Sequence, residues 1–193
     1  IRFRNSVRLI HISTVAVYGS IDHATEDSPL NPENDYAKAK LIAEKSLLKS
    51  FDSSNLTILR LPNIYGSKQK VGFLRYLLRS YNSDRKLNFD NDGYLYRSFL
   101  HAEDCAKIIV QIVDKREFSG IYNVSGPESF YLRDIISKFE KDFGFLFDTK
   151  FVEKKSWDNI KNLDDSKLRN LINIVTQWRL FHFISSELGV KSK

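Results

Sequence analysis

Short apolar runs alternate with longer helical patterns along the first third of this chain, and this alternation constrains the fold more than any other feature. The run from Val7 to Ser13 is rich in β-branched residues and predicts a buried strand. Asn34 or Asp35 can cap a helix that runs to about Ser50, and Leu56 to Leu61 predicts a second strand. Strands that alternate with helices indicate a layered α/β fold with some parallel strands.

The rest of the chain continues this alternation. The polar segment from Gly19 to Pro32 predicts a loop, and Pro62 to Lys70 predicts another. Further helices are expected at Val71–Ser80, Ala102–Asp114, Leu132–Phe143, near Asp165–Asn173 and near Trp178–Leu188, with strands at Ile121–Val124 and Phe145–Val152 and a hairpin over Lys86–His101 that turns at Asn91–Gly93.

Composition limits the kind of protein this is. A chain of 193 residues can form one domain with a core, or one domain and a small lobe, and 42% apolar residues is ordinary for a soluble globular protein. No apolar stretch approaches the roughly 20 residues that a membrane span needs. The single cysteine, Cys105, excludes an internal disulfide and fits a reducing compartment, so we expect a cytoplasmic protein with Cys105 buried on a helix.

The net charge of +6 could suit a nucleic acid, a membrane surface or an anionic small molecule. The basic residues are spread along the chain, and only Lys154-Lys155 and Lys191 to Lys193 form short concentrations. Dispersed charge is typical of a solvated surface, so we expect neither a nucleic-acid partner nor a membrane partner. A diphosphate-bearing substrate explains a few specific arginines better.

Tyr36 and Lys40 are four residues apart at the start of the first predicted helix, so their side chains point the same way. Ser13 and Thr14 end the strand that precedes them. A hydroxyl, a phenol and an ammonium brought together could pass a proton to and from a carbinol or ketone. The pair alone is weak evidence, because it could equally be an exposed pair on an ordinary helix.

Four further segments keep a fixed order after this pair. In this order and at these spacings the chain resembles the extended short-chain dehydrogenase/reductases, the NAD-dependent sugar epimerase/dehydratase family, from about Val7 to at least Leu171. The segments are Arg60–Gly66, Arg97–Asp104, Tyr122–Gly126 and Leu163–Leu168.

The resemblance implies an α/β fold: a partial Rossmann-type parallel sheet with helices, plus a small α/β substrate-binding lobe. Residues 1–68, interleaved with about 102–126, would be the remaining part of the nucleotide-binding domain. Residues 69–101 and 127–193 would form the substrate-binding lobe.

Roles for the proton-transfer residues also follow from the resemblance. Tyr36 would be the catalytic acid/base and would contact the cofactor. Lys40 would favour the phenolate and bond the cofactor ribose. Thr14 would bond the reacting oxygen, with Ser13 as the neighbouring candidate; a strand-end hydroxyl that only bonds backbone is the alternative for Thr14.

The resemblance assigns three more residues to ligands. The backbone at Pro62 would approach the nicotinamide of NAD or NADP, and Asn63 would contact the substrate. Arg97 would hold the nucleotide diphosphate, for which a guanidinium is well shaped, although a surface ion pair is the alternative. His101 and Asp104 are expected to orient the hairpin and cap the following helix. No spacing of His, Cys, Asp or Glu predicts a metal site.

The glycine-rich loop that holds the cofactor pyrophosphate in this family is missing from the sequence. The chain has only 8 glycines, and none of them form Gly-x-x-Gly-x-x-Gly. We therefore expect a fragment whose edge at Val7 to Ser13 is open, and which lacks tight dinucleotide binding by itself. A complementary N-terminal half, or a homodimer through the helix that carries Tyr36, is the expected macromolecular partner.

One more absence limits which reaction of the family we expect. The family's 4,6-dehydratases place an acidic residue between the catalytic Ser/Thr and the following Tyr-Gly pair, where this chain has Val15, Ala16 and Val17. The leading interpretation is thus part of an NAD(P)-dependent nucleotide-sugar epimerase or reductase rather than a dehydratase. The alternatives are a non-catalytic remnant or interaction module, and a basic nucleic-acid binder.

Overall fold

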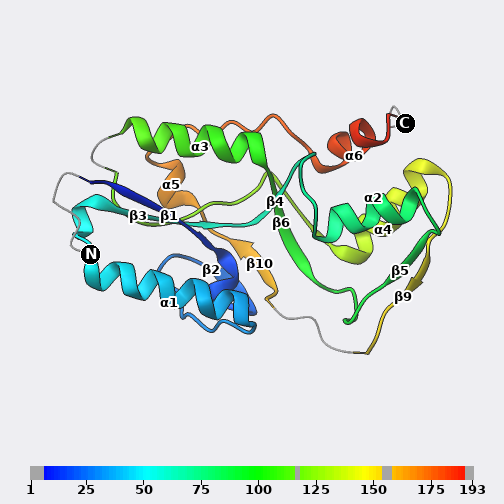
Figure 1. Cartoon of the computed structure of the whole chain (residues 1–193), viewed down its shortest axis with the longest axis horizontal. Helices are drawn as coiled ribbons and strands as arrows, with labels where there is room; N and C mark the ends of the chain where they lie inside the picture. The colour runs from blue at the N-terminus through cyan, green and yellow to red at the C-terminus, as the bar shows by residue number, and fades with distance from the viewer. Residues whose placement is uncertain (1–6, 116–117, 154–157, 190–193) are drawn as a thin grey trace.

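A computed structural model describes residues 7–115, 118–153 and 158–189 (Figure 1). The short basic concentrations at Lys154-Lys155 and at Lys191 to Lys193 lie outside these ranges. The helices are α1 (Asp35–Ser50), α2 (Phe73–Tyr81), α3 (Ala102–Asp114), α4 (Leu132–Phe143), α5 (Ser166–Arg169) and α6 (Leu180–Leu188), with 3-10 turns at Val15–Tyr18 and Ser53–Asn55. The strands are β1 (Leu9–Thr14), β2 (Ile21–Ala24), β3 (Leu56–Leu61), β4 (Asn63–Tyr65), β5 (Lys86–Asn88), β6 (Tyr96–His101), β7 (Gly120–Asn123), β8 (Glu128–Tyr131), β9 (Asp148–Lys150) and β10 (Ile160–Leu163).

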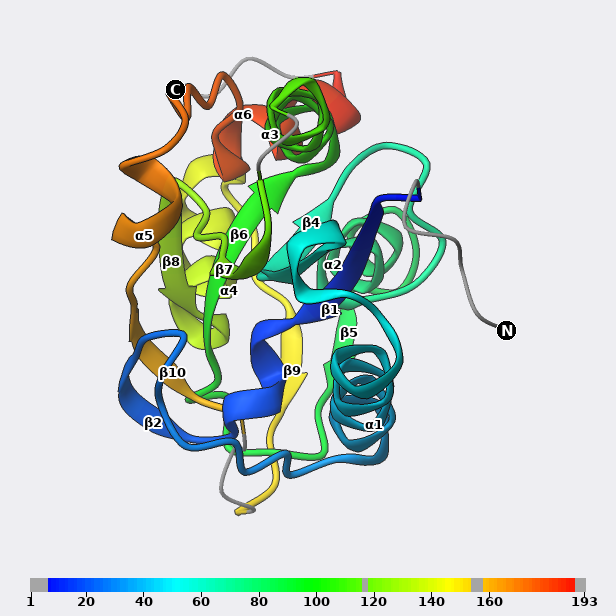
Figure 2. The same cartoon turned by 90° about the vertical axis from the view of Figure 1, so that its left-hand side faces the viewer.

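A parallel sheet in the order β1-β3-β7 lies between two helices, which confirms the predicted α/β class. Figures 1 and 2 show α3 on one side of this sheet and α1 on the other. Strand β3 is buried along its whole length, as expected for a central parallel strand. Cys105 is buried on α3 against β3, as predicted. Within the described residues β1 pairs only with β3, and Ile12 on this strand is 38% exposed.

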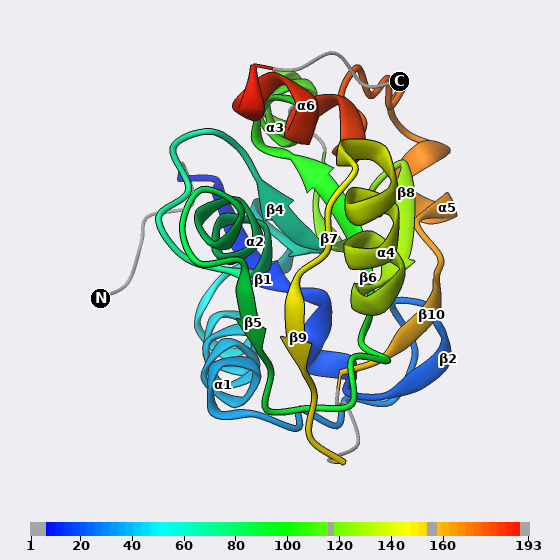
Figure 3. The same cartoon turned by 90° about the vertical axis from the view of Figure 1, so that its right-hand side faces the viewer.

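The second part of the fold is built around aromatic residues. Strands β4, β6 and β8 form a mixed sheet, and β5 pairs in parallel with β9. Figure 3 shows α2 and α4 on this side of the molecule, above β5 and β9. The helices share one apolar core, whose buried members include Leu77, Leu87, Ile135 and Phe139. The division of the chain into a nucleotide-binding part and a substrate-binding lobe stays a prediction.

Two predictions of local structure are wrong. Lys86 to His101 is no hairpin, because β5 pairs with β9 while β6 pairs with β4 and β8. The turn itself does form at Gly93, where φ is +76° and Asn91 Oδ1 accepts from the backbone N–H at 2.9 Å. The segment from Gly19 to Pro32 also contains a strand, β2, which pairs with the distant β10. Partners so far apart in sequence leave no local pattern.

Several element ends also differ from the prediction. The helix expected near Asp165–Asn173 is only one turn, Ser166–Arg169, and the strand expected over Phe145–Val152 is reduced to Asp148–Lys150. The other predicted helices agree with α1, α2, α3, α4 and α6 to within a few residues. These are the segments with strong apolar periodicity, which is the more reliable signal.

Candidate functional site

Five of the seven residues predicted to act on ligands line one pocket of about 180 Å³. Four elements bring these residues together. Strand β1 contributes Thr14, helix α1 contributes Tyr36, and strand β6 contributes Arg97. Asn63 begins β4, and Pro62 directly precedes that strand. The pocket lies where β1 and β3 end, which is where parallel α/β sheets place their ligands. Its other lining residues include Asn34, Tyr96, Ser98 and Asp158.

Thr14 sits at the point where β1 becomes a 3-10 turn. Its Oγ1 accepts a hydrogen bond from the backbone N–H of Ala16 at 3.2 Å, which caps the turn Val15–Tyr18. The turn ends at Gly19, where φ is +69° and a Cβ would lie 2.1 Å from the carbonyl oxygen of Asn31. A hydroxyl that accepts from the backbone can still donate its own proton to a ligand. Thr14 is therefore held in place by a bond that does not use its hydroxyl proton.

Helix α1 presents Tyr36 and Lys40 beside this strand end. Asn34 caps the helix, because its Oδ1 accepts from the backbone N–H of Ala37 at 2.8 Å. The Tyr36 side chain is 61% exposed. Lys40 Nζ lies 5.9 Å from the centre of the Tyr36 ring and donates to the carbonyl oxygen of Ile12 at 2.9 Å. The phenol and the ammonium are thus close to each other at the open edge of β1.

Ser13, the neighbouring candidate to Thr14, does not line the pocket. Successive residues of a strand point to opposite faces, so only one of the two hydroxyls can face it. Ser13 is 3% exposed, and its Oγ donates to Glu44 on α1. The geometry favours Thr14 as the residue that meets a ligand and gives Ser13 a contact inside the protein.

A buried ion pair joins β3 to α1. Arg60 Nη2 donates to Glu44 Oε2 at 2.8 Å, and the two side chains are 2% and 1% exposed. Arg60 Nη1 also donates to the hydroxyl of Tyr18 at 2.8 Å, and that hydroxyl donates to Asn123 Oδ1 at 2.7 Å. Burial raises the pKa of Tyr18, so it stays a neutral phenol. This network links β3, α1 and β7, and therefore fixes the helix that carries Tyr36.

This ion pair was not predicted from the sequence. The only available signal was spacing, since Glu44 follows Lys40 by four residues and lies on the same face of the helix. Nothing in the sequence indicated that Arg60 would be its partner.

Asn63 and Arg97 form the far side of the pocket. The exposed Asn63 follows the buried Pro62, and its Nδ2 donates to the carbonyl oxygen of Ser98 at 3.4 Å. The half-buried guanidinium of Arg97 donates to the carbonyl oxygens of Tyr96, at 3.0 Å, and Asp158. Burial lowers the pKa of Arg97 to about 10, so it is still a cation at neutral pH. Arg97 is thus half-buried at the pocket and bonded to two backbone carbonyl oxygens.

Asp158 brings a carboxyl group to the pocket that the sequence analysis missed. It is 5% exposed and lies 122 residues from Tyr36 in the chain, so no local pattern could place it there. Its backbone is left-handed, with φ +57°. Asn34 donates to its Oδ2, and burial raises the pKa of the carboxyl group. Asp158 is thus an acidic residue of the pocket that comes from a segment distant from Thr14 and Tyr36 in the chain.

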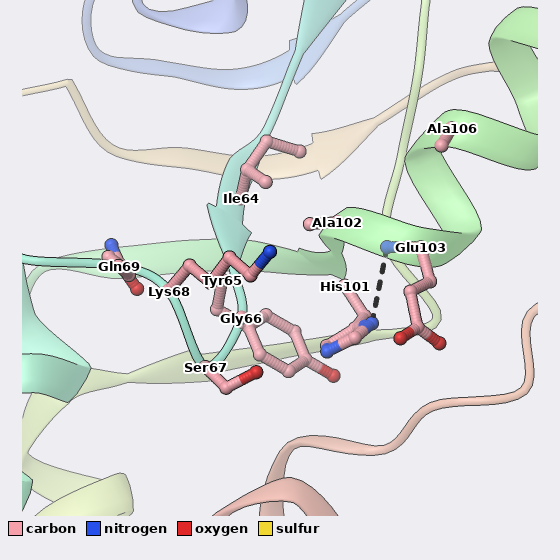
Figure 4. A pocket seen from close by; sticks show the side chains of 10 residues that line it. All are labelled: Ile64, Tyr65, Gly66, Ser67, Lys68, Gln69, His101, Ala102, Glu103 and Ala106. Carbon is pink, nitrogen blue, oxygen red and sulfur yellow. Dashed lines mark hydrogen bonds between the residues drawn. The ribbon is translucent and has the colours of Figure 1, made fainter.

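A larger cavity of about 500 Å³ lies elsewhere, beside the start of α3 (Figure 4). None of the residues predicted to act on ligands line it. His101 lines this cavity, and its Nδ1 accepts from the backbone N–H of Glu103 at 3.3 Å, so it caps α3 as predicted. Asp104 does not cap the helix. It instead accepts from the backbone N–H groups of Gln177 and Trp178, each at 3.0 Å, and so ties the C-terminal segment to α3.

The described residues show neither a metal-binding cluster nor a membrane-spanning helix. Within residues 7–115, 118–153 and 158–189, no three or more His, Cys, Asp or Glu side chains are grouped so that they could hold a metal ion. Over the same ranges, each helix is too short or too polar to pass through a bilayer.

Comparison with known proteins gives the wider context of this site. The sequence profile of the NAD dependent epimerase/dehydratase family matches residues 1–125. A trifunctional UDP-glucose 4,6-dehydratase/UDP-4-keto-6-deoxy-D-glucose 3,5-epimerase/UDP-4-keto-L-rhamnose-reductase of Arabidopsis thaliana is 31% identical over 176 residues, which cover 85% of this chain and 26% of that protein. A dTDP-glucose 4,6-dehydratase of Streptomyces griseus is 25% identical over 164 residues, 82% of this chain and 47% of that one. The chain thus spans less than half the length of these relatives.

Solved structures resemble the fold closely. The dTDP-glucose 4,6-dehydratase of Bacillus anthracis, in complex with NAD, superposes with a TM-score of 0.83 at 21% identity, over 94% of this chain and 60% of that one. The UDP-glucuronic acid 4-epimerase of Bacillus cereus, in complex with UDP-glucuronic acid and NAD, gives 0.80 at 26% identity, over 93% and 60%. The likeness establishes the Rossmann-type α/β fold of the described residues.

Proposed function

Because this chain belongs to the NAD-dependent epimerase/dehydratase family, we propose that it forms the proton-transfer and substrate-binding part of a nucleotide-sugar epimerase or reductase. One observation carries the proposal. Thr14, Tyr36, Asn63 and Arg97 come from separate segments of the chain, and they line a single pocket at the end of the parallel sheet. A set of hydroxyl, phenol, amide and guanidinium groups suits a ligand with sugar hydroxyls and phosphates.

The residues fit the nicotinamide end of a dinucleotide. Tyr36 is exposed, Lys40 lies beside it, and both stand at the edge of β1, where a bound nicotinamide ribose would find a hydroxyl and an ammonium. NAD or NADP, when bound, supplies hydride transfer at the sugar carbon. Tyr36 would take the proton from the sugar hydroxyl and return it, with Lys40 favouring the phenolate and Thr14 holding the reacting oxygen.

Arg97 and Asn63 would hold the substrate. A guanidinium that is partly desolvated binds a diphosphate more strongly than an exposed one, because less water screens the charge. The pocket is smaller than the roughly 300–1,000 Å³ that is usual for a drug-sized ligand, so it would enclose only part of a nucleotide sugar.

The proposal favours epimerisation or ketone reduction over dehydration. Dehydration requires a group that protonates the leaving hydroxyl, and Val15, Ala16 and Val17 provide none. The solved relative at 26% identity is a 4-epimerase, which supports this choice, whereas several other relatives are 4,6-dehydratases.

Tight dinucleotide binding would need a complementary half. The sequence has no glycine-rich loop for the pyrophosphate, and among the described residues β1 has no strand on its outer edge. A polypeptide that adds a parallel strand there and brings such a loop would complete the site. The second candidate function is a non-catalytic interaction module that lacks dinucleotide binding.

Titration of the 193-residue chain with UDP-glucose, UDP and NAD separates these functions. We expect binding of UDP-glucose and UDP, and NAD affinity weaker than micromolar. Binding of neither uridine nucleotide would favour the non-catalytic module. Micromolar affinity for NAD would overturn the requirement for a complementary half.

A further inference from the structure

Asp158 is held by bonds to three of its four hydrogen-bonding groups. Its backbone N–H donates to Glu33 Oε2 at 2.6 Å, and its carbonyl oxygen accepts from Arg97. Its Oδ2 accepts from Asn34 Nδ2. The fourth group, Oδ1, is buried and has no hydrogen-bond partner. Asp158 is therefore fixed in place with its Oδ1 unused as an acceptor, and it lines the same pocket as Thr14 and Tyr36.

This arrangement is costly for the protein alone. A buried carboxylate oxygen without a partner loses its hydration and gains no hydrogen bond in return. The left-handed backbone of Asp158 adds strain, since it is one of only two non-glycine residues with positive φ among the described residues. An unsatisfied, strained acidic residue in a ligand pocket is typical of a group whose partner is the ligand.

The neighbours of Asp158 indicate what kind of partner it takes. Arg97, whose guanidinium contacts the Asp158 carbonyl oxygen, disfavours a metal ion or an organic cation at this point. An anionic group placed directly at Oδ1 is disfavoured by the carboxylate itself. A neutral O–H donor satisfies the acceptor without adding charge, and a sugar offers several.

We propose that Asp158 determines specificity for the sugar, and that its Oδ1 accepts a hydrogen bond from a hydroxyl group of the bound nucleotide sugar. This inference rests on the proposed function, and it identifies the sugar as the part of the ligand that the carboxyl group recognises. Asn34 bonds Asp158 and caps α1, so the contact also ties the sugar to the helix that carries Tyr36.

Two substitutions separate this role from a structural one. Asp158→Asn keeps the size of the side chain and an acceptor for Asn34, and asparagine tolerates positive φ. Asp158→Gly removes both oxygens and relieves the backbone strain. Asp164→Asn is the matched control, because it removes the same charge from a residue that does not line the pocket.

The measurement is the affinity of each folded variant for UDP-glucose and for UDP, by calorimetry on the full 193-residue chain. Loss of a hydrogen bond to a charged group predicts UDP-glucose binding about 10- to 100-fold weaker in Asp158→Gly and weaker to a lesser extent in Asp158→Asn. UDP affinity should stay within about twofold for both, as should both affinities of Asp164→Asn.

Wild-type affinity for UDP-glucose in both Asp158 variants would overturn this role and leave the proposed function intact. Equal affinity of the wild-type chain for UDP and UDP-glucose would also overturn it, because the sugar would then make no net contact. Failure of the wild-type chain to bind either ligand would overturn the role and the proposed function together.

Discussion

Two tyrosines of this protein, Tyr18 and Tyr36, have opposite environments, although Tyr36 lines the pocket and the turn that ends at Tyr18 also contributes residues to it. Tyr18 is 1% exposed, and its hydroxyl lies between Arg60 and Asn123. Tyr36 is 61% exposed and has Lys40 beside it. The contrast shows that the two phenols serve different ends. The Tyr18 hydroxyl connects β3 to β7, whereas the exposed Tyr36 hydroxyl is accessible to a ligand.

Helix α1 repeats the contrast along one face. Tyr36 and Lys40 stand at its open end, whereas Glu44, one turn further, is buried in the ion pair with Arg60. The buried pair sets the position of the helix, and the exposed pair would act on the ligand. Substitutions on the two sides should therefore affect different quantities.

The largest effect on stability is expected from Glu44→Ala. It leaves the guanidinium of Arg60 buried without its carboxylate, which should lower the free energy of unfolding by about 3–5 kcal/mol. Urea denaturation followed by circular dichroism measures this. The double variant Glu44→Leu with Arg60→Met should recover much of the loss, and a loss below about 1 kcal/mol in the single variant would contradict the role of the pair.

A smaller effect, on ligand binding, is expected from Arg97→Ala. Removal of the guanidinium should weaken UDP binding about 10- to 100-fold, because a charge-assisted bond to phosphate is lost. Calorimetry measures this, with Arg79→Ala on α2 as the control, since Arg79 is exposed and does not line the pocket. Unchanged UDP affinity in Arg97→Ala would exclude the diphosphate contact.

The smallest effect is a dependence of stability on pH at the larger cavity. Burial lowers the pKa of His101 below its ordinary value of 6.5, so the unfolded chain takes up the proton first as the pH falls. Stability contributed by neutral His101 is thus present above pH 6.5 and declines below it. Thermal melting between pH 7.5 and 5 should show this decline, and His101→Asn, which keeps a cap acceptor, should reduce it. An identical decline in the variant would assign it to other groups, such as His11, whose pKa burial also lowers.

The sequence predicted those parts of the fold whose signal is local. The periodicity of α1, α3 and α4 and the continuous apolar run of β3 depend on neighbouring residues, and these elements agree with the structure. Strands β2, β5, β9 and β10 have three or four residues each, and their partners are distant in the chain. Such short strands are stabilised by tertiary pairing, which no local pattern records.

The candidate site divides in the same way. Thr14, Tyr36, Pro62, Asn63 and Arg97 could be brought together because they belong to motifs in a recognisable order, and they share a pocket. Contacts made by single side chains were not predictable: the ion pair of Arg60, the inward turn of Ser13 and the approach of Asp158 all follow from packing. The sequence therefore indicated which residues meet the ligand better than it indicated what holds them there.

The most direct test compares Tyr36→Phe with Tyr18→Phe in a polypeptide that also carries a glycine-rich cofactor-binding half. Each variant loses one hydroxyl. Three quantities are measured for each: turnover of a nucleotide sugar, affinity for that substrate, and the free energy of unfolding. We predict that Tyr36→Phe lowers turnover by about 100-fold or more with affinity and stability unchanged, since proton transfer contributes about 10²- to 10⁴-fold. Tyr18→Phe should instead lower stability by about 1–3 kcal/mol and largely keep turnover. Equal loss of turnover and affinity in Tyr36→Phe, or full turnover without its hydroxyl, would contradict the account.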